Sequence, residues 1–319
     1  MPNDARGTTR LARYALVALL ASPAVPAVPA VPAVRAVRAV RAVRAGVGGK
    51  IARKDPVLTT RHLNAGASIK VFNSAGSVRL IGWTHDSIEV HGNVSPRSAY
   101  FAVGDVRGMK IGVDDPRPGE PPPHGDIAIY LPRGTQVSVK TVNGDIDAAD
   151  VSGWLYTVAG AVHVSGTAAT MEVEDMRGDV DLNATVPWLR ARGGAGHMTV
   201  RGVVQDADVS TISGALDVPG GGIIRGQFAS VSGDIRWVGA PAAGAILDFS
   251  DHSGAVDLAL ARGASGAFTL STIEGTIANA FASVRPVSQE QRSAHFRIGS
   301  GGGDIAVRTF KGAIRVRQQ

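Results

Sequence analysis

The chain of 319 residues contains no cysteine. This absence excludes disulfide bonds, thiolate metal sites, cysteine nucleophiles and lipidation of an N-terminal cysteine. Aromatic residues make up only 5% of the chain, and no segment has the periodicity of a long amphipathic helix. The eight histidines show no paired ligand spacing, and no Gly-x-Ser-x-Gly nucleophile motif occurs. The sequence therefore predicts a protein that is not an enzyme, and no catalytic, cofactor-binding or metal-binding residue is assigned.

Positive charge is not in excess outside the N-terminal segment. The formal net charge is +6, but residues 1–54 hold ten of the 33 Lys and Arg residues and one of the 27 Asp and Glu residues. The remaining residues therefore carry a net charge of −3. A nucleic-acid-binding domain is typically basic, so nucleic acid is not expected as a partner of the folded part.

Residues 1–54 have the composition of a targeting segment followed by a linker. Arg6, Arg10 and Arg13 precede an apolar run over residues 14–21, and small-residue sites follow. This order is typical of a secretory signal peptide, although a low-complexity tail is the alternative. The repeated Ala-Val-Pro and Ala-Val-Arg units predict an extended tether, whose basic part could contact an anionic membrane surface. We therefore expect an extracytoplasmic location, either periplasmic, secreted or at the cell surface.

Glycine, by contrast, is abundant, with 40 residues, and part of it is periodic. From residue 135 onward a short sequence motif recurs: an apolar residue, a small polar residue, a glycine and another apolar residue. Its anchor glycines are 16 to 28 residues apart. A repeat near 18 residues is too short for a helical repeat and indicates a β-solenoid. The predicted corner glycines are Gly144, Gly160, Gly178, Gly196, Gly214, Gly233, Gly254, Gly275 and Gly303.

The flanks of each anchor glycine explain why it should mark a corner. The residues five before and two after it are apolar in all nine copies, and the residue three before it is small or polar. Side chains alternate faces along a strand, so two positions seven apart would lie on opposite faces of a flat strand. Both can face one core only if the chain bends between them, and glycine tolerates such bends. The fold class is thus all-β: a parallel β-helix or β-solenoid with about nine rungs.

The remaining residues divide into two predicted regions. Residues 55–134 contain short alternating strands and are expected to form an N-terminal β cap, because solenoid ends need covering. Residues 135–319 hold the solenoid repeats. The last strand, near residues 314–316, carries Arg315 and Arg317 and is interpreted as a charged edge strand.

Several segments in this order resemble a known family. They are the opening Ile69-Lys70-Val71-Phe72-Asn73 with Gly76-Ser77-Val78-Arg79-Leu80, the segment Ile129-Tyr130-Leu131-Pro132-Arg133-Gly134, and units such as Val142-Asn143-Gly144-Asp145-Ile146 and Val231-Ser232-Gly233-Asp234-Ile235. Together they are similar to the bacterial "putative adhesin" β-solenoid family, a group of largely unknown function. The resemblance covers roughly residues 58–318. It implies a parallel β-helix-like fold and an association with the cell envelope, and it brings no catalytic residues.

Two residue sets leave alternatives open. Carboxylates that follow anchor glycines could form an acidic row that acts on a polysaccharide, but hydrogen bonding to backbone at corners is the favoured interpretation. These carboxylates belong to Asp145, Asp179, Asp234 and Asp304. Tryptophan rings could serve as glycan-stacking platforms, although packing in the core or under loops is favoured. The tryptophans are Trp83, Trp154, Trp188 and Trp237.

The sequence therefore favours an exported, non-enzymatic β-solenoid that acts as an envelope scaffold or an adhesin-like surface-binding protein. A cell-surface glycan or an envelope protein is the expected partner, and open solenoid ends make self-association a further expectation. The alternative is a polysaccharide-active β-helix enzyme that uses acidic residues on one face.

Overall fold

The computed structural model describes residues 56–114, 122–220, 222–281 and 292–319. The predicted signal peptide and linker over residues 1–54 lie outside this range. The described residues form strands joined by turns and loops, and all 22 of these strands belong to one hydrogen-bonded sheet. In the part of the chain that the structure describes, no helix has the length and hydropathy to cross a bilayer. The predicted all-β class with a solenoid-like arrangement is confirmed.

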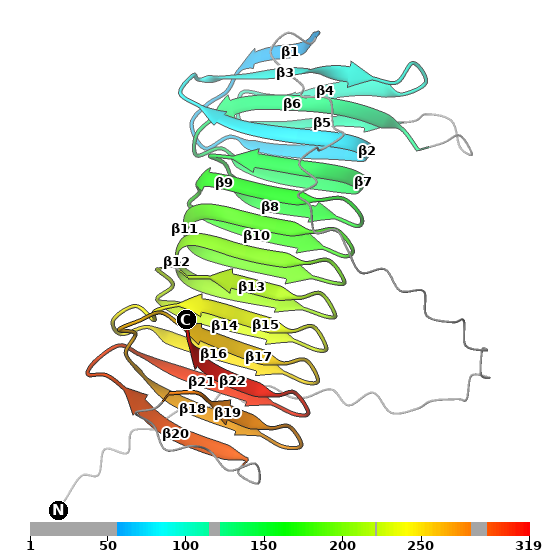
Figure 1. Cartoon of the computed structure of the whole chain (residues 1–319). Helices are drawn as coiled ribbons and strands as arrows, with labels where there is room; N and C mark the ends of the chain where they lie inside the picture. The colour runs from blue at the N-terminus through cyan, green and yellow to red at the C-terminus, as the bar shows by residue number, and fades with distance from the viewer. Residues whose placement is uncertain (1–55, 115–121, 221, 282–291) are drawn as a thin grey trace, which may run out of the picture. The chain divides into compact units, whose positions relative to one another are not determined.

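Each layer of the stack consists of two strand segments, an arm before a corner and an arm after it (Figure 1). Four long strands span two arms: the first two continue through the corner of one layer, and the last two continue through the second bend into the first arm of the next layer. These long strands are β2 (Ser68–Trp83), β7 (Gln136–Ala149), β11 (Val180–Gly193) and β12 (Met198–Thr211). The other first-arm strands are β5 (Gly108–Asp114), β8 (Ser152–Thr157), β10 (Thr170–Asp175), β14 (Arg225–Ser230), β16 (Ile246–Asp251), β18 (Gly266–Thr272) and β21 (Gly303–Thr309). The other second-arm strands are β6 (His124–Pro132), β9 (Val162–Thr167), β13 (Leu216–Pro219), β15 (Ile235–Gly239), β17 (Val256–Leu260), β19 (Ile277–Asn279) and β22 (Ile314–Gln318).

Parallel pairing places equivalent repeat positions directly above one another. In the first arm, Val173 of β10 pairs with Leu155 of β8 and with Ala191 of β11. In the second arm, Val180 of β11 pairs with Val162 of β9 and with Met198 of β12. All of these side chains are buried, as the alternation rule predicts for residues that face a shared interior.

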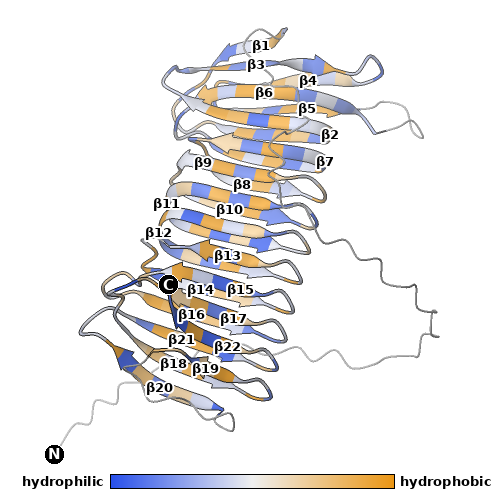
Figure 2. Cartoon of the chain, viewed as in Figure 1, coloured by the Kyte–Doolittle hydropathy of each residue, from blue (hydrophilic) through white to orange (hydrophobic). Residues whose placement is uncertain are grey.

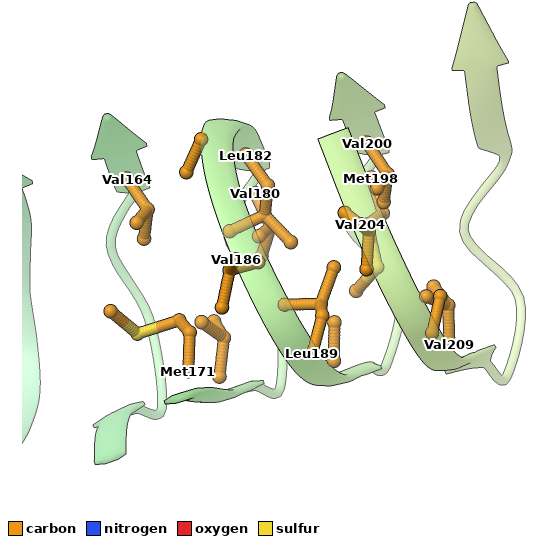
Figure 3. Packing of buried hydrophobic residues seen from close by; sticks show 14 of the residues in the cluster. Val164, Met171, Val180, Leu182, Val186, Leu189, Met198, Val200, Val204 and Val209 are labelled. Atoms are coloured by element: carbon orange, nitrogen blue, oxygen red, sulfur yellow. The ribbon is translucent and has the colours of Figure 1, made fainter. Parts of the chain in front are cut away.

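The interior is a narrow column of aliphatic side chains between the two arms. Figure 3 shows Met171, Leu189 and Val209 of the first arm facing Val180 and Met198 of the second arm. Further along the stack, Phe228 and Phe249 are stacked with ring centroids 5.0 Å apart. Figure 2 shows the matching alternation of hydrophobic and hydrophilic residues along the strands. Each such buried side chain contributes roughly 1.5–3 kcal/mol relative to exposure.

Eleven glycines form a continuous column at the corner. On ten of them, all except Gly125 at the end of the column, a Cβ atom would lie too close to the backbone carbonyl oxygen of the glycine in the adjacent layer; on Gly196, for example, it would lie 1.8 Å from the oxygen of Gly178. Glycine is therefore needed because adjacent backbones approach closely, and most of these residues do not have positive φ angles. In stacking order the column is Gly125, Gly76, Gly144, Gly160, Gly178, Gly196, Gly214, Gly233, Gly254, Gly312 and Gly275.

Eight of the nine predicted corner glycines belong to this column, and Gly303 does not. Gly303 opens β21, where it pairs with Gly266 and a Cβ would meet the carbonyl oxygen of Ala245. The corner of that layer is made by Gly312, whose flanks Val307 and Ile314 are fully buried. Ile298, which the sequence pattern assigned to the core, is only half-buried in an antiparallel strand. The assignment of Gly303 as a corner was therefore wrong.

The stacking order differs from the chain order at the C-terminal end. After β16 and β17 the chain continues to β18 and β19, but these two pairs of strands are not adjacent layers of the stack. The layer between them consists of β21 and β22, which pair with β16 and β17 on one side and with β18 and β19 on the other. β22 is therefore an internal strand, so the interpretation of residues 314–316 as an edge strand was wrong. The edge of the first arm is β20 (Ser293–Ile298), which pairs antiparallel with β18.

The N-terminal end is interleaved in a similar way. β2 pairs in parallel with β7, and β5 and β6 pair in parallel with the outer side of β2. Three antiparallel strands then cover the end: β1 (Val57–His62), β3 (Ser87–Val94) and β4 (Ala99–Asp105). The region 55–134, predicted to be a cap, thus supplies layers that continue the repeat as well as strands that cover it.

Candidate functional site

The most regular surface of the stack is the outward side of the first arm, which we call the outer face. It consists of three rows of side chains that run from β7 to β14 across the strands. The first row is Gln136, Ser152, Thr170, Trp188, Asp206 and Arg225; the second is Ser138, Trp154, Glu172, Arg190, Asp208 and Gln227; the third is Lys140, Tyr156, Glu174, Arg192, Ser210 and Ala229. Strands sit about 4.8 Å apart, so each row is about 24 Å long.

The charges on the outer face largely neutralise one another. The Arg190 guanidinium lies 3.7 Å from the carboxylate of Glu172 on one side and 3.7 Å from that of Asp208 on the other. In the first row, Arg225 donates two hydrogen bonds to the carboxylate of Asp206. Exposed ion pairs of this kind contribute about 0–1 kcal/mol each to stability. Their main effect is to give the face paired hydrogen-bonding groups without a strong field of either sign.

Aromatic rings are concentrated in the same rows. Trp188 on β11 is 40% exposed, although tryptophan is usually well covered. Trp154 and Tyr156 on β8 are half-buried, with ring centroids 5.6 Å apart and a tilt of 32°. The Lys140 ammonium lies 5.4 Å from the centroid of Tyr156. The outer face therefore combines flat apolar rings with polar groups.

Two shallow hollows flank Trp188, and its side chain lines both. The first has a volume of about 340 Å³ and lies between Trp188 and Trp154, over Gly153, Ser138 and Thr170. Gln136 and Glu172 also line it. The second hollow, also about 340 Å³, is lined on its far side by Asp206, Asp208, Arg225 and Gln227.

The other two tryptophans serve packing. Trp237 on β15 is only 3% exposed and belongs to the core. Trp83 at the end of β2 donates its indole N–H to the carbonyl of Ser87, 2.8 Å away, across the turn into β3. The favoured interpretation of tryptophans as packing residues is thus confirmed for these two, whereas Trp154 and Trp188 point outward.

Three of the four carboxylates that follow predicted anchor glycines bind backbone. An Oδ1 atom of Asp145, Asp179 and Asp234 accepts a hydrogen bond of 2.8 Å from a backbone N–H in the next layer. The donors are Ala161, His197 and Ala255. The interpretation as backbone-binding groups is confirmed for these three residues, and the bonds link adjacent layers. Asp304 lies apart from them on β21, because Gly303 is not a corner glycine.

Two histidines lie beside separate carboxylates. The Nε2 atom of His197 lies 3.2 Å from Asp217, and that of His91 lies 3.2 Å from Glu89. Among the described residues, no group of three or more His, Cys, Asp or Glu side chains is placed to hold a metal ion.

The family assignment rests on the repeat region. The family model described as "Toastrack DUF4097" matches residues 123–317, which include β6 to β21 and most of β22. The chain belongs to the Toastrack family. The resemblance to the "putative adhesin" group inferred from the sequence is therefore confirmed. No curated protein matches the chain.

Solved structures similar to this Toastrack chain carry adhesion-related names. A putative adhesin from Bacteroides fragilis NCTC 9343 has 14% identity and a TM-score of 0.41, over 81% of this chain and 95% of that one. A putative cell adhesion protein from Clostridium sporogenes ATCC 15579 has 10% identity and a TM-score of 0.20, over 82% and 98%. A putative adhesin from Parabacteroides merdae ATCC 43184 has 10% identity and a TM-score of 0.25, over 82% and 95%.

The Toastrack repeats also bury a polar column beside the corner glycines. The side chain three residues before the corner is buried in nearly every layer and binds backbone there. Ser230, for example, accepts a hydrogen bond of 2.8 Å from the N–H of Gly233, and Thr272 accepts one of 2.9 Å from Gly275. Such bonds satisfy backbone groups that the bend removes from the ladders.

Two members of this polar column are carboxylates. Asp175 and Asp251 each use Oδ1 to accept hydrogen bonds from corner N–H groups, while Oδ2 is buried without a hydrogen-bond partner. Burial disfavours the charged form, so it raises the pKa of Asp175 above its usual value and that of Asp251 to about 6. These residues lie inside the stack, so their effect is on stability and its pH dependence.

Proposed function

We propose that this chain is an exported, non-enzymatic surface-binding protein of the adhesin type, located in the cell envelope or at the cell surface. The observation that carries the proposal is the outer face, where six paired first-arm segments hold their side chains in register. A rigid face with a regular spacing suits a partner that is itself extended or repetitive, such as a surface polymer.

The composition of the N-terminal segment supports the exported location, since Arg6, Arg10 and Arg13 precede an apolar run. The adhesion-related names of the structural neighbours agree with a role in surface binding. The non-enzymatic part is supported by the use of Asp145, Asp179 and Asp234 as ties between layers, because carboxylates engaged by backbone N–H groups are poor candidates for paired acid–base catalysis.

Two experiments test the proposal. Cells that express the chain with a C-terminal tag would be fractionated, and intact cells would be treated with protease. We expect a processed product outside the cytoplasm; a full-length chain found soluble in the cytosol contradicts export. The purified full chain would then be sedimented with isolated cell envelopes, where we expect saturable retention. Absence of retention at any concentration contradicts the surface-binding role.

A further inference from the structure

We infer that the two hollows beside Trp188 form a binding site for an uncharged polysaccharide chain, which lies across the strands of the outer face. This inference rests on the proposed function and names the partner and the residues that hold it. It starts from Trp188, whose exposed indole has no packing role comparable to that of Trp237.

The rings provide the apolar half of the recognition. A sugar ring presents C–H groups on its faces and hydroxyl groups around its edge. A flat indole or phenol can cover the C–H face, and aromatic residues gain most when a partner buries them. Trp154 and Trp188 are two strands and two residues apart, which corresponds to about 12 Å. They are thus spaced to contact different sugar units of one chain.

The polar side chains provide the other half. The first hollow offers the Gln136 amide, the Ser138 and Thr170 hydroxyls and the Glu172 carboxylate. The second offers the Gln227 amide and the ion pair of Arg225 with Asp206. Hydroxyl groups of a sugar can donate to the carboxylates and accept from the amides and the guanidinium. Both hollows therefore match the dense hydroxyl edge of a saccharide.

The balance of charge favours a neutral chain over an acidic one. The charged residues that line the two hollows are Glu172, Asp206, Asp208 and Arg225, and Arg190 bridges two of these carboxylates. No excess of cationic groups is present in these linings to attract carboxylate or sulfate groups. An acidic polysaccharide would bring its charges against linings that hold three carboxylates and one guanidinium, whereas a neutral one needs only the rings and the hydrogen-bonding groups.

The backbone argues against an added peptide strand at the same place. A peptide that augments a sheet needs an edge with unpaired N–H and C=O groups. The first-arm strands under the hollows, β8, β10, β11 and β12, are each paired with a strand on both sides. Recognition at this site must therefore use side chains, and the available side chains suit a saccharide.

The test uses the purified full chain with neutral oligosaccharide probes, cellohexaose and chitohexaose, and with polygalacturonate as the acidic probe. Binding would be measured by isothermal titration calorimetry and by quenching of tryptophan fluorescence. We expect at least one neutral probe to bind more tightly than polygalacturonate. Replacing Trp188→Ala should weaken that binding about tenfold or more, while Trp188→Phe should retain most of it.

The matched control is Ile212→Ser at the corner, where an apolar side chain with 59% exposure lies outside the outer face. This variant should bind as the unmodified chain does. If the Trp188→Ala variant has the unfolding temperature of the unmodified chain and binds the neutral oligosaccharides with the same affinity, the proposed site is wrong. The inference is also wrong if polygalacturonate binds more tightly than both neutral probes, or if neither neutral probe binds.

The outcome also separates this inference from the proposed function. If envelopes retain the unmodified chain and the Trp188→Ala variant equally, and neutral probes do not compete, the polysaccharide site is wrong while surface binding stands. If envelopes do not retain the unmodified chain, the proposed function itself fails, whatever the oligosaccharide probes show.

Discussion

The buried carboxylate of Asp251 predicts an unusual pH dependence of stability. Its side chain is 5% exposed, and its pKa is raised to about 6 because burial outweighs the hydrogen bonds from Gly254 and Ser230. In the unfolded chain the pKa returns to the ordinary value of 3.8. The folded state therefore binds the proton more tightly, so this residue destabilises the fold as pH rises from about 4 to about 6.

The magnitude follows from the size of the shift. A difference of about two pKa units corresponds to about 3 kcal/mol between the protonated and the charged residue. Asp251→Asn keeps an oxygen for the Gly254 N–H and cannot ionise. An amide N–H that finds no good acceptor would cost about 1 kcal/mol. We expect Asp251→Asn to stabilise the chain by about 2 kcal/mol at pH 7.5 and to give no stabilisation at pH 4.

Urea denaturation followed by circular dichroism, at steps from pH 4 to pH 8, would measure this difference. Exposed Asp304→Asn is the control, and its effect should stay within about 0.5 kcal/mol at every pH. The deciding quantity is the difference between Asp251→Asn and the unmodified chain. If that difference is the same at pH 4 and at pH 7.5, the explanation through a buried, raised carboxyl is refuted.

Three further predictions concern the stack itself. Gly196→Ala should destabilise the chain by about 3 kcal/mol because its Cβ would meet a carbonyl oxygen, whereas Gly222→Ala, with 3.4 Å to its nearest neighbour, should be near neutral in the same denaturation assay. Val209→Asp should cost about 3–5 kcal/mol by burying an unpaired charge, and exposed Ser213→Ala should be mild; equal melting points contradict the inward assignment. Deleting residues 303–319 should expose β18 and β19 to hydrogen exchange, and full protection there would contradict the interleaved order.

The repeat itself could be predicted from the sequence because its determinants are local. A glycine, a small polar residue three before it and two apolar flanks define one corner, and parallel stacking then follows from their recurrence. Two further corners carry the same signature but were missed. Gly76 has buried Val71 and Val78 as flanks, and Gly312 has Val307 and Ile314.

These corners were missed for different reasons. The segment before Gly76 also has the composition of a turn between hairpin strands, so it was assigned to the cap. Gly303 matches the repeat in sequence as well as Gly312 does, and only the pairing of β21 with β16 distinguishes them. The order of layers at the two ends depends on which strands meet in space, and the spacing of a local motif does not contain that information.

The outer face was predictable only in part. The sequence leaves glycan stacking open for all four tryptophans and favours packing, and the shared outward face of Trp154 and Trp188 depends on the register of β8, β10 and β11. Trp154 lies two residues after the start of its strand segment, and Trp188 opens its segment, so no sequence period relates them. The hollows between them became visible only in the folded chain.

The position of β21 and β22 has a consequence for how the protein is made. A ribosome releases the layers in chain order, so β18 and β19 emerge before the strands that must separate them from β16 and β17. This end of the molecule cannot close until β21 and β22 have left the ribosome. A chain truncated before β21 would lack the layer that joins β18 and β19 to β16 and β17. Proteases could then degrade the truncated chain, while the full chain would resist them.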